Sequence, residues 1–419
     1  MSNYSAALRQ VHNEMTHILS EGVIPFWVTR GIDRENGGFL TSFDADGRAV
    51  EQRAKYLVTQ TRMLWGFSRL YRKYGEEHYL EAARSGFRFL RDHFWDPDYG
   101  GWFWSSDPAG KALDRGKVVY GESFAIYALV EFAGACASDE ARHLAEATFD
   151  LLQKYATDTR HGGYFENLEP DWQRSGPGFE AGDRKSLDIH MHLMEAFTEL
   201  AALTGAEIHR RKLLEVTDVI VSRMIDAESG SGGNQYDERF QPIAPIAIRR
   251  TWNAERKSGE RAADARQTTS YGHNIELVWL VHRACGAADV PTARYHGYTR
   301  RLAEHTLRFG VDREYGGVFR DGLPDGTPLV RDKEWWQNCE SLVGFLDAYH
   351  EFEDERYLEA FQSVWNFTRD HLYNNVQGEF RQLTDRAGNV LAGDLGNPWK
   401  AFYHSGRALL ESMARLEKL

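Results

Sequence analysis

The chain has 419 residues, 42% of them hydrophobic, and is therefore long enough to bury a large core. Its 62 acidic residues outnumber its 50 basic ones, and this net charge of −12, with no basic run, argues against a nucleic-acid-binding protein. No apolar run is long enough to span a bilayer or to form the core of a signal peptide, which argues against a membrane or secreted protein.

A glycine motif followed by a short segment with a strand-like residue pattern recurs six times along the chain. The copies are "ENGGFLTSFDADG", "DYGGWFWSSDPAG", "RHGGYFENLEPDW", "SGGNQYDERFQ", "EYGGVFRDGLPDG" and "VQGEFRQLTDRAG". The recurring glycines that mark them are Gly38, Gly101, Gly163, Gly233, Gly317 and Gly378. A near-regular interval of this kind is typical of an architecture built from repeated units.

Between the glycine motifs, apolar residues recur at helical spacing. Three successive pairs of such segments lie at 55–75 with 77–96, 120–136 with 139–158, and 187–205 with 207–226. Each repeat is therefore predicted to be two helices, followed by a glycine turn and short strands.

Six helix pairs can stack as an open solenoid or close into a ring. Segments such as 193–200 and 340–349 carry large apolar side chains on more than one face, which fits an inner ring of helices covered by an outer ring. Neither end of the chain shows the polar capping repeat that an open solenoid needs. We therefore predict an all-α fold, an (α/α)6 barrel of six helix hairpins with short β-like Gly-Gly connections, in a single domain covering 1–419.

Polar and aromatic residues interrupt the otherwise apolar sequence near the starts of several predicted helices. Such residues usually serve packing or are exposed when they occur singly, but a barrel brings the helix starts together at one end. We therefore expect one pocket that contains Arg62, Tyr120, Asp188, His192, His273, Glu276, Trp336, Trp399 and His404. Asp188 and Glu195 should share a helix face with His192, whereas His190 should point elsewhere.

The pocket predicted in this way suits proton transfer on a sugar. Histidine titrates near neutral pH and can both take and give a proton, and an arginine can hold the oxygen of an enediolate. The main alternative is an inverting glycoside hydrolase, with candidate acids Glu180, Asp188 and Glu276. A non-catalytic sugar-binding protein would explain the tryptophans but not the histidines.

No cofactor or metal is expected from the sequence. It contains neither a dinucleotide fingerprint nor a phosphate-binding loop. His190 and His192 diverge on a helix, and no further ligands complete a metal site with them. The three cysteines, Cys136, Cys285 and Cys339, have no metal-like spacing and cannot all pair, so we expect a reducing, cytoplasmic environment.

Four segments carry a resemblance to a known family: "KSLDIHMHLMEAFTEL", "GHNIELVWL", "KEWWQNCESLVGFLDAY" and "YHSGRALLE". They resemble the N-acylglucosamine 2-epimerase superfamily, in its cellobiose 2-epimerase and mannose 2-epimerase branch. The resemblance implies an (α/α)6 barrel that inverts C2 of a reducing sugar through ring opening and a cis-enediolate. It implies that His273 and His404 are the acid/base pair, that His192 assists ring opening and that Arg62 holds the enediolate oxygen. It further implies that the sugar is bound by Tyr120, Glu276, Trp336 and Trp399.

Two features depart from the cellobiose 2-epimerase pattern. Asp188 stands where cellobiose 2-epimerases usually carry Asn, and the interval between Gly233 and Gly317 is the longest of the five. The additional residues 243–270 are expected to form either a tolerated surface loop or a lid. A lid would bring Trp252 and Glu255 into the pocket and would resemble the long loop of the mannose 2-epimerases, in which a Trp and an acidic residue reach the pocket. A lid would exclude a second sugar ring, so we expect D-mannose and D-glucose as substrates. Cellobiose epimerisation and aldose–ketose (mannose) isomerisation are the alternatives, and we expect a monomer or homodimer.

Overall fold

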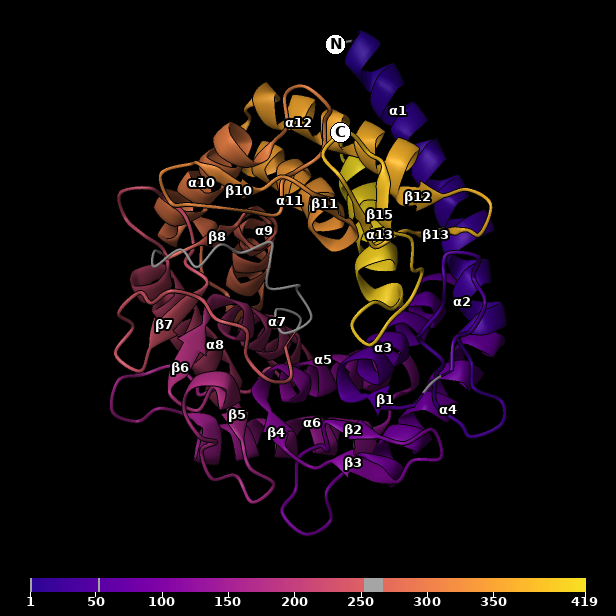
Figure 1. Cartoon of the computed structure of the whole chain (residues 1–419), viewed down its shortest axis with the longest axis vertical. Helices are drawn as coiled ribbons and strands as arrows, with labels where there is room; N and C mark the ends of the chain where they lie inside the picture. The colour runs from indigo at the N-terminus through magenta and orange to yellow at the C-terminus, as the bar shows by residue number, and fades with distance from the viewer. Residues whose placement is uncertain (1, 52, 252–266) are drawn as a thin grey trace.

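The computed structural model describes residues 2–51, 53–251 and 267–419, in which the helices form two concentric rings (Figure 1). Each inner helix contacts the next, and the last contacts the first, so the ring is closed. The predicted (α/α)6 barrel is therefore confirmed. The inner helices are α3 (Leu57–Tyr74), α5 (Val119–Cys136), α7 (Leu187–Thr204), α9 (Tyr271–Ala288), α11 (Trp335–Phe352) and α13 (Phe402–Leu416).

The outer helices each cover the inner helix of their own repeat. They are α4 (Glu77–His93), α6 (Asp139–Leu151), α8 (Glu207–Val219), α10 (His296–His305) and α12 (Glu355–Phe367), while α1 (Ser2–His17) packs on α13 and is followed by α2 (Ile24–Arg30). Outer helices bury one face, whereas every residue of α5 from Val119 to Ala133 is buried. This difference explains why the sequences of the inner helices carry apolar residues on more than one face.

An aspartate turn, repeated around the ring, leads into the strands. In the first copy, Asp33 Oδ1 accepts the N–H groups of Glu35 and Asn36 at 3.0 Å, and the N–H of Gly37 donates to Asp33 O. Gly37 has φ 83°, which favours glycine. Equivalent turns start at Asp96, Asp158, Asp226, Asp312 and Asn374.

These turns correct the repeat register predicted for two copies. In the fourth, Gly230 and not Gly233 occupies the left-handed position, with φ 73°. In the sixth, Gly378 corresponds to Gly37 and not to Gly38, because its N–H donates to Asn374 O. The turn is defined by its aspartate or asparagine, which the glycine spacing alone did not identify.

Short antiparallel strands join neighbouring repeats at the N-terminal ends of the inner helices. The pairs are β1 (Lys55–Tyr56) with β2 (Ser105–Ser106), β4 (Lys117–Val118) with β5 (Asn167–Leu168), β6 (Arg184–Ser186) with β7 (Gln235–Asp237), β8 (Thr269–Ser270) with β9 (Asp321–Gly322), and β11 (Lys333–Glu334) with β14 (Leu383–Thr384). The remaining strands are β3 (Ala112–Asp114), β10 (Pro328–Val330), β15 (Val390–Ala392), β12 (Tyr373–Asn374) and β13 (Glu379–Phe380). A bridge between Phe43 and Gly396 joins the last repeat to the first.

A buried lysine stands two residues before five of the six inner helices and pairs with an acid of the preceding turn. Lys55, Lys117 and Lys185 each lie 2.8 Å from their aspartates, while Lys333 and Lys400 lie 3.1 and 3.0 Å from Asp312 and Glu379. A buried ion pair of this kind is costly to break, because either partner alone would be left as an uncompensated charge. The lysines therefore hold the helix starts rigidly against the turns.

The fourth residue of most inner helices accepts a hydrogen bond from the backbone just after the turn. The acceptors are Gln60, Glu122, His190, Asn274 and Asn338, at 2.9–3.0 Å. This repeat explains His190, whose Nε2 accepts from Tyr164 N while Nδ1 contacts Ser186 O. Burial lowers the pKa of His190 to about 4, so the ring is neutral and serves the fold.

The opposite end of the barrel is closed by charged residues. One comes from the thirteenth or fourteenth position of each inner helix: Arg69, Glu131, Glu199, Arg283, Asp347 and Arg415. Arg283 pairs with Glu199 at 2.5 Å and Arg415 with Asp347 at 3.0 Å.

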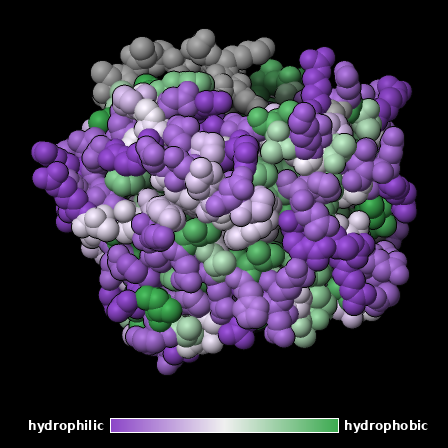
Figure 2. All heavy atoms as spheres, turned by 90° about the horizontal axis from the view of Figure 1, so that it is seen from below, coloured by the Kyte–Doolittle hydropathy of each residue, from purple (hydrophilic) through white to green (hydrophobic). Residues whose placement is uncertain are grey.

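On the face drawn in Figure 2, hydrophobic side chains form small separate groups among hydrophilic ones. Among the described helices, none is long and apolar enough to cross a membrane.

Candidate active site

A cavity lies at the N-terminal ends of the inner helices. Every predicted site residue within the described ranges lines the cavity, together with Trp335, which the sequence did not single out for a role. Trp252 and Glu255 lie outside the described residues.

The lining residues occupy two levels of the helical repeat. The upper level comes from the second or third residue of an inner helix: Tyr120, Asp188, His273, Trp336 and His404. The lower level comes from the sixth residue: Arg62, His192 and Glu276. Because residues three or four positions apart share a helix face, one turn of each helix supplies both levels.

His192 lies between two carboxylates. Its Nδ1 is 2.9 Å from Glu195 Oε2 and its Nε2 is 3.4 Å from Asp188 Oδ1, so the predicted shared face exists. Burial favours the neutral ring, but the two carboxylates outweigh it and raise the pKa of His192 to about 9. Burial would likewise raise the pKa of Glu195, but Arg407 and His192 lower it to about 2. His192 is therefore an imidazolium at neutral pH.

His404 has the opposite electrostatic environment. Its Nδ1 lies 2.7 Å from Glu340 Oε1, and its ring packs near Trp336, with centroids 5.7 Å apart. Burial and the positive charges of Arg62 and Arg407 hold the pKa of His404 well below its ordinary value. A neutral ring that donates from Nδ1 to Glu340 keeps the Nε2 lone pair available, as a general base requires.

His273 approaches the cavity from α9. Its Nε2 is 3.5 Å from Asp188 Oδ1, and its ring centroid is 4.6 Å from that of Trp336. His273 and His404 thus contact the same indole from two different helices.

Arg62 supplies a positive charge at the cavity. Its guanidinium donates to Tyr120 Oη at 2.8 Å and to the carbonyl oxygen of Trp399 at 2.5 Å. The group also lies over the ring of Phe124, 4.4 Å from its centroid. These contacts fix a cation beside the catalytic histidine candidates.

The sequence matches the N-acylglucosamine 2-epimerase (GlcNAc 2-epimerase) family over residues 37–408. The chain belongs to this family. Cellobiose 2-epimerase from Bacteroides fragilis is 28% identical over 95% of this chain and 97% of its own, and D-mannose isomerase from Marinomonas mediterranea is 25% identical over 94% and 95%. The structure of cellobiose 2-epimerase from Spirochaeta thermophila superposes with a TM-score of 0.87, at 32% identity, covering 100% of this chain and 99% of that one. The protein is therefore a carbohydrate epimerase of the isomerase class.

The polar network under the epimerase cavity was largely missed by the sequence analysis. Arg407, the sixth residue of α13, donates to Glu276 at 2.6 Å and to Glu340 at 2.7 Å, and also contacts Glu195 and Tyr403. The sequence did contain an indication of this network: Arg407 stands in an otherwise apolar helical segment, three residues after His404, as Arg62 does in α3.

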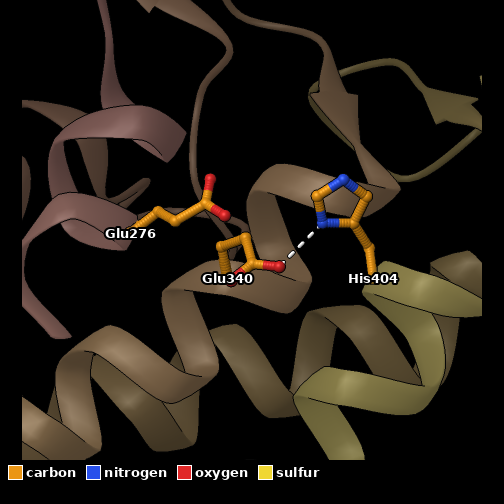
Figure 3. Close-up of side chains that lie close together, drawn as sticks. All are labelled: Glu276, Glu340 and His404. Atoms are coloured by element: carbon orange, nitrogen blue, oxygen red, sulfur yellow. Dashed lines mark hydrogen bonds and ion pairs between the residues drawn. The ribbon is translucent and has the colours of Figure 1, made fainter. Parts of the chain in front are cut away.

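In the described part of the chain, Glu276, Glu340 and His404 form a cluster of potential metal ligands, with one ligand atom of each within 4.8 Å of the others (Figure 3). The Arg407 guanidinium already contacts both carboxylates, so this cluster has a cation from the protein itself. Burial and the neighbouring Glu340 raise the pKa of Glu276 to about 8. Its Oε2 is buried and has no hydrogen-bond partner among the described residues.

Glu180, an acid considered for glycoside hydrolysis, does not line the epimerase cavity. It lies in a short helical turn, Gly178–Glu180, and pairs with Arg249 at 3.2 Å. A solved GH76 α-mannanase from Bacteroides thetaiotaomicron shares the fold at 10% identity, with a TM-score of 0.64, and so bears on architecture alone.

Proposed function

We propose that this epimerase interconverts D-mannose and D-glucose by inversion at C2, without a cofactor. The observation that carries the proposal is the pair His273 and His404, which project from α9 and α13 into one cavity and both pack on Trp336. An indole face suits the apolar C–H face of a sugar ring. A sugar on Trp336 would therefore have two histidines within reach of its C2.

The charge states of the site support a proton-transfer sequence. His192, as an imidazolium, can protonate the ring oxygen while the C1 hydroxyl releases its proton to water, which opens the ring; the reverse transfers close the ring after inversion. One of His273 and His404 then takes the C2 proton, and the other gives a proton to the opposite face. Arg62 stabilises the negative charge that develops on the enediolate oxygen. In the reverse reaction the two histidines exchange roles, and exchange with water restores their protonation states between turnovers.

The connection between β7 and β8 supports a monosaccharide substrate. Its described residues cross to neighbouring repeats: Arg250 pairs with Asp114 at 2.7 Å, and Asn167 donates to Arg249 O at 3.0 Å. Ile248 and Thr251 line a second cavity that also contains Asp188 and His273. We propose that this connection limits the cavity to one sugar ring and that Trp252 and Glu255, which lie outside the described residues, bind that sugar.

Cellobiose is the second candidate substrate, because several relatives in the family are cellobiose 2-epimerases. Aldose–ketose isomerisation is the third, because another relative is a D-mannose isomerase. Both follow from the same enediolate: reprotonation at C2 gives the epimer, whereas reprotonation at C1 gives the ketose.

The test is incubation of the protein with D-mannose, D-glucose, cellobiose and a β-1,4-glucan, with the products resolved by chromatography. Rapid conversion between mannose and glucose is the expected result. Faster epimerisation of cellobiose would reverse the choice of substrate, and accumulation of fructose would establish the isomerase. Release of glucose from the glucan without any epimer would contradict the proposed chemistry.

A further inference from the structure

A single carboxylate oxygen faces two of the histidines in the cavity. Asp188 Oδ1 is 3.4 Å from His192 Nε2 and 3.5 Å from His273 Nε2. Asp188 and His192 are one turn apart on α7, whereas His273 comes from α9. The Asp188 side chain is 27% exposed and lines the cavity, whereas Oδ1 itself is buried and faces the two histidines at ion-pair distance without a hydrogen bond.

The remaining contacts of the two histidines differ. His192 has a second carboxylate at Nδ1, that of Glu195, which also accepts from Arg407 and Tyr403. The two histidines therefore share Asp188 but not Glu195. The other titratable or charged groups that interact electrostatically with Asp188 or His192 are Arg62, Tyr120, Glu166, Glu276, Glu340 and His404.

We propose that Asp188 is a positioning residue, a shared counter-ion that couples the protonation of His192 to that of His273; the inference rests on the proposed function of this pocket. One negative charge favours one neighbouring imidazolium strongly. A second imidazolium at the same oxygen would gain the same attraction but would be repelled by the first. Two groups coupled in this way titrate as a pair and not as independent sites.

The coupling gives Asp188 a role that asparagine cannot fill. An amide of the same shape can still accept one hydrogen bond, but it carries no charge. When His192 releases its proton, the carboxylate becomes available to stabilise a proton on His273. Asp188 thereby favours a single protonated ring, on either His192 or His273, during the successive steps of the reaction.

The test compares matched acid-to-amide variants of the full-length protein labelled with ¹⁵N-histidine. Ring-nitrogen shifts are followed against pH by NMR and assigned with His192→Gln and His273→Gln. Asp188→Asn should lower the pKa of His192 by about 1 to 3 pH units and move the titration midpoint of His273 to lower pH as well. Glu195→Gln should affect His192 far more than His273.

Glu122→Gln is the control. Glu122 is a buried acid that accepts from Trp102 N, as Gln60 accepts from Phe39 N in the first repeat, and it does not line the cavity. This variant should leave both histidine titrations unchanged. If Asp188→Asn moved His192 but left His273 unchanged, the shared counter-ion would be refuted, whichever sugar the enzyme uses.

A second readout separates this inference from the proposed function. The alkaline limb of the kcat/KM profile for mannose should move to lower pH in Asp188→Asn, while circular dichroism and thermal unfolding stay close to those of the wild type. An unmoved alkaline limb would contradict the coupling. Failure of the wild-type protein to epimerise any sugar would overturn the proposed function while leaving the NMR result to decide the coupling.

Discussion

Replacing His404 by Asn should abolish epimerisation but leave hydrogen exchange at C2 in one of the two epimers. A two-base mechanism assigns one histidine to each face of C2. In His404→Asn, His273 can still remove the C2 proton from the epimer that presents it to α9. Without a donor on the other face, a solvent deuteron returns to the face from which the proton left.

The size of the effect follows from what the variant retains. His404 Nδ1 contacts Glu340 at 2.7 Å, and an asparagine amide can preserve part of that hydrogen bond. The free energy of unfolding should therefore fall by only roughly 1 kcal/mol. Loss of the titrating group should reduce kcat/KM for epimerisation by about 10²–10⁴-fold, which is about 2.7–5.4 kcal/mol of transition-state stabilisation.

The assay is turnover of D-mannose and of D-glucose in D₂O, followed by ¹H NMR of the C2 position, for the wild type, His404→Asn and His273→Asn. The wild type should label C2 of the product, and the two variants should label opposite substrates without forming the epimer. If His404→Asn epimerised at the wild-type rate, the assignment of His404 would be wrong. Wild-type product free of deuterium after many turnovers would argue for a shielded single base or a hydride transfer.

Three further predictions address binding, specificity and stability. Arg62→Gln should lower kcat by about 10²–10³-fold with a smaller change in KM, measured by steady-state kinetics, because the cation acts on the enediolate. Alanine at both Trp252 and Glu255 should slow mannose turnover and admit cellobiose, and unchanged kinetics would make that segment a surface loop. Asp347→Asn should lower the free energy of unfolding at pH 7 by roughly 2 kcal/mol. Burial opposes ionisation of Asp347, but its hydrogen bond with His282 and the charge of Arg415 hold its pKa below the ordinary value, so this difference should disappear as acid protonates the carboxyl.

The closed barrel and most of the pocket could be predicted because both follow from local patterns. Helical spacing gave the hairpins, and polar residues such as His192 and Arg62 stood out against apolar text at the helix starts. The glycine register was wrong in the fourth and sixth copies because spacing alone did not reveal the turns that begin at Asp226 and Asn374.

Contacts between distant repeats could not be predicted in the same way. Glu340 and Arg407 are 67 residues apart in the sequence and meet only because α11 and α13 are neighbours in the ring. From the sequence alone, Lys333 would be interpreted as an exposed cation, whereas in the structure it is buried and lies beside Asp312. A single charged residue in a helical segment is more often exposed, so sequence alone favours the wrong environment for each of these residues.

The arrangement of the repeats also explains why the pocket lies at this end of the barrel. All six inner helices point their N-termini toward it, and helix N-termini carry partial positive charge from unpaired N–H groups. In the proposed mechanism, this field would act together with Arg62 to favour an anionic enediolate over the neutral sugar.

The repeat that departs most from the others borders the proton-transfer residues. Thr269 occupies the position of the buried lysine in the fourth copy, and the corresponding Asp226 is exposed. That copy carries the long connection whose described end, Thr251, lines a cavity with Asp188 and His273. Lysine pairs thus anchor five of the helix starts around the site, while α9, which carries His273, lacks this anchor and follows the long connection. We therefore expect substrate choice to depend on this connection, next to His273, more than on the five anchored helix starts.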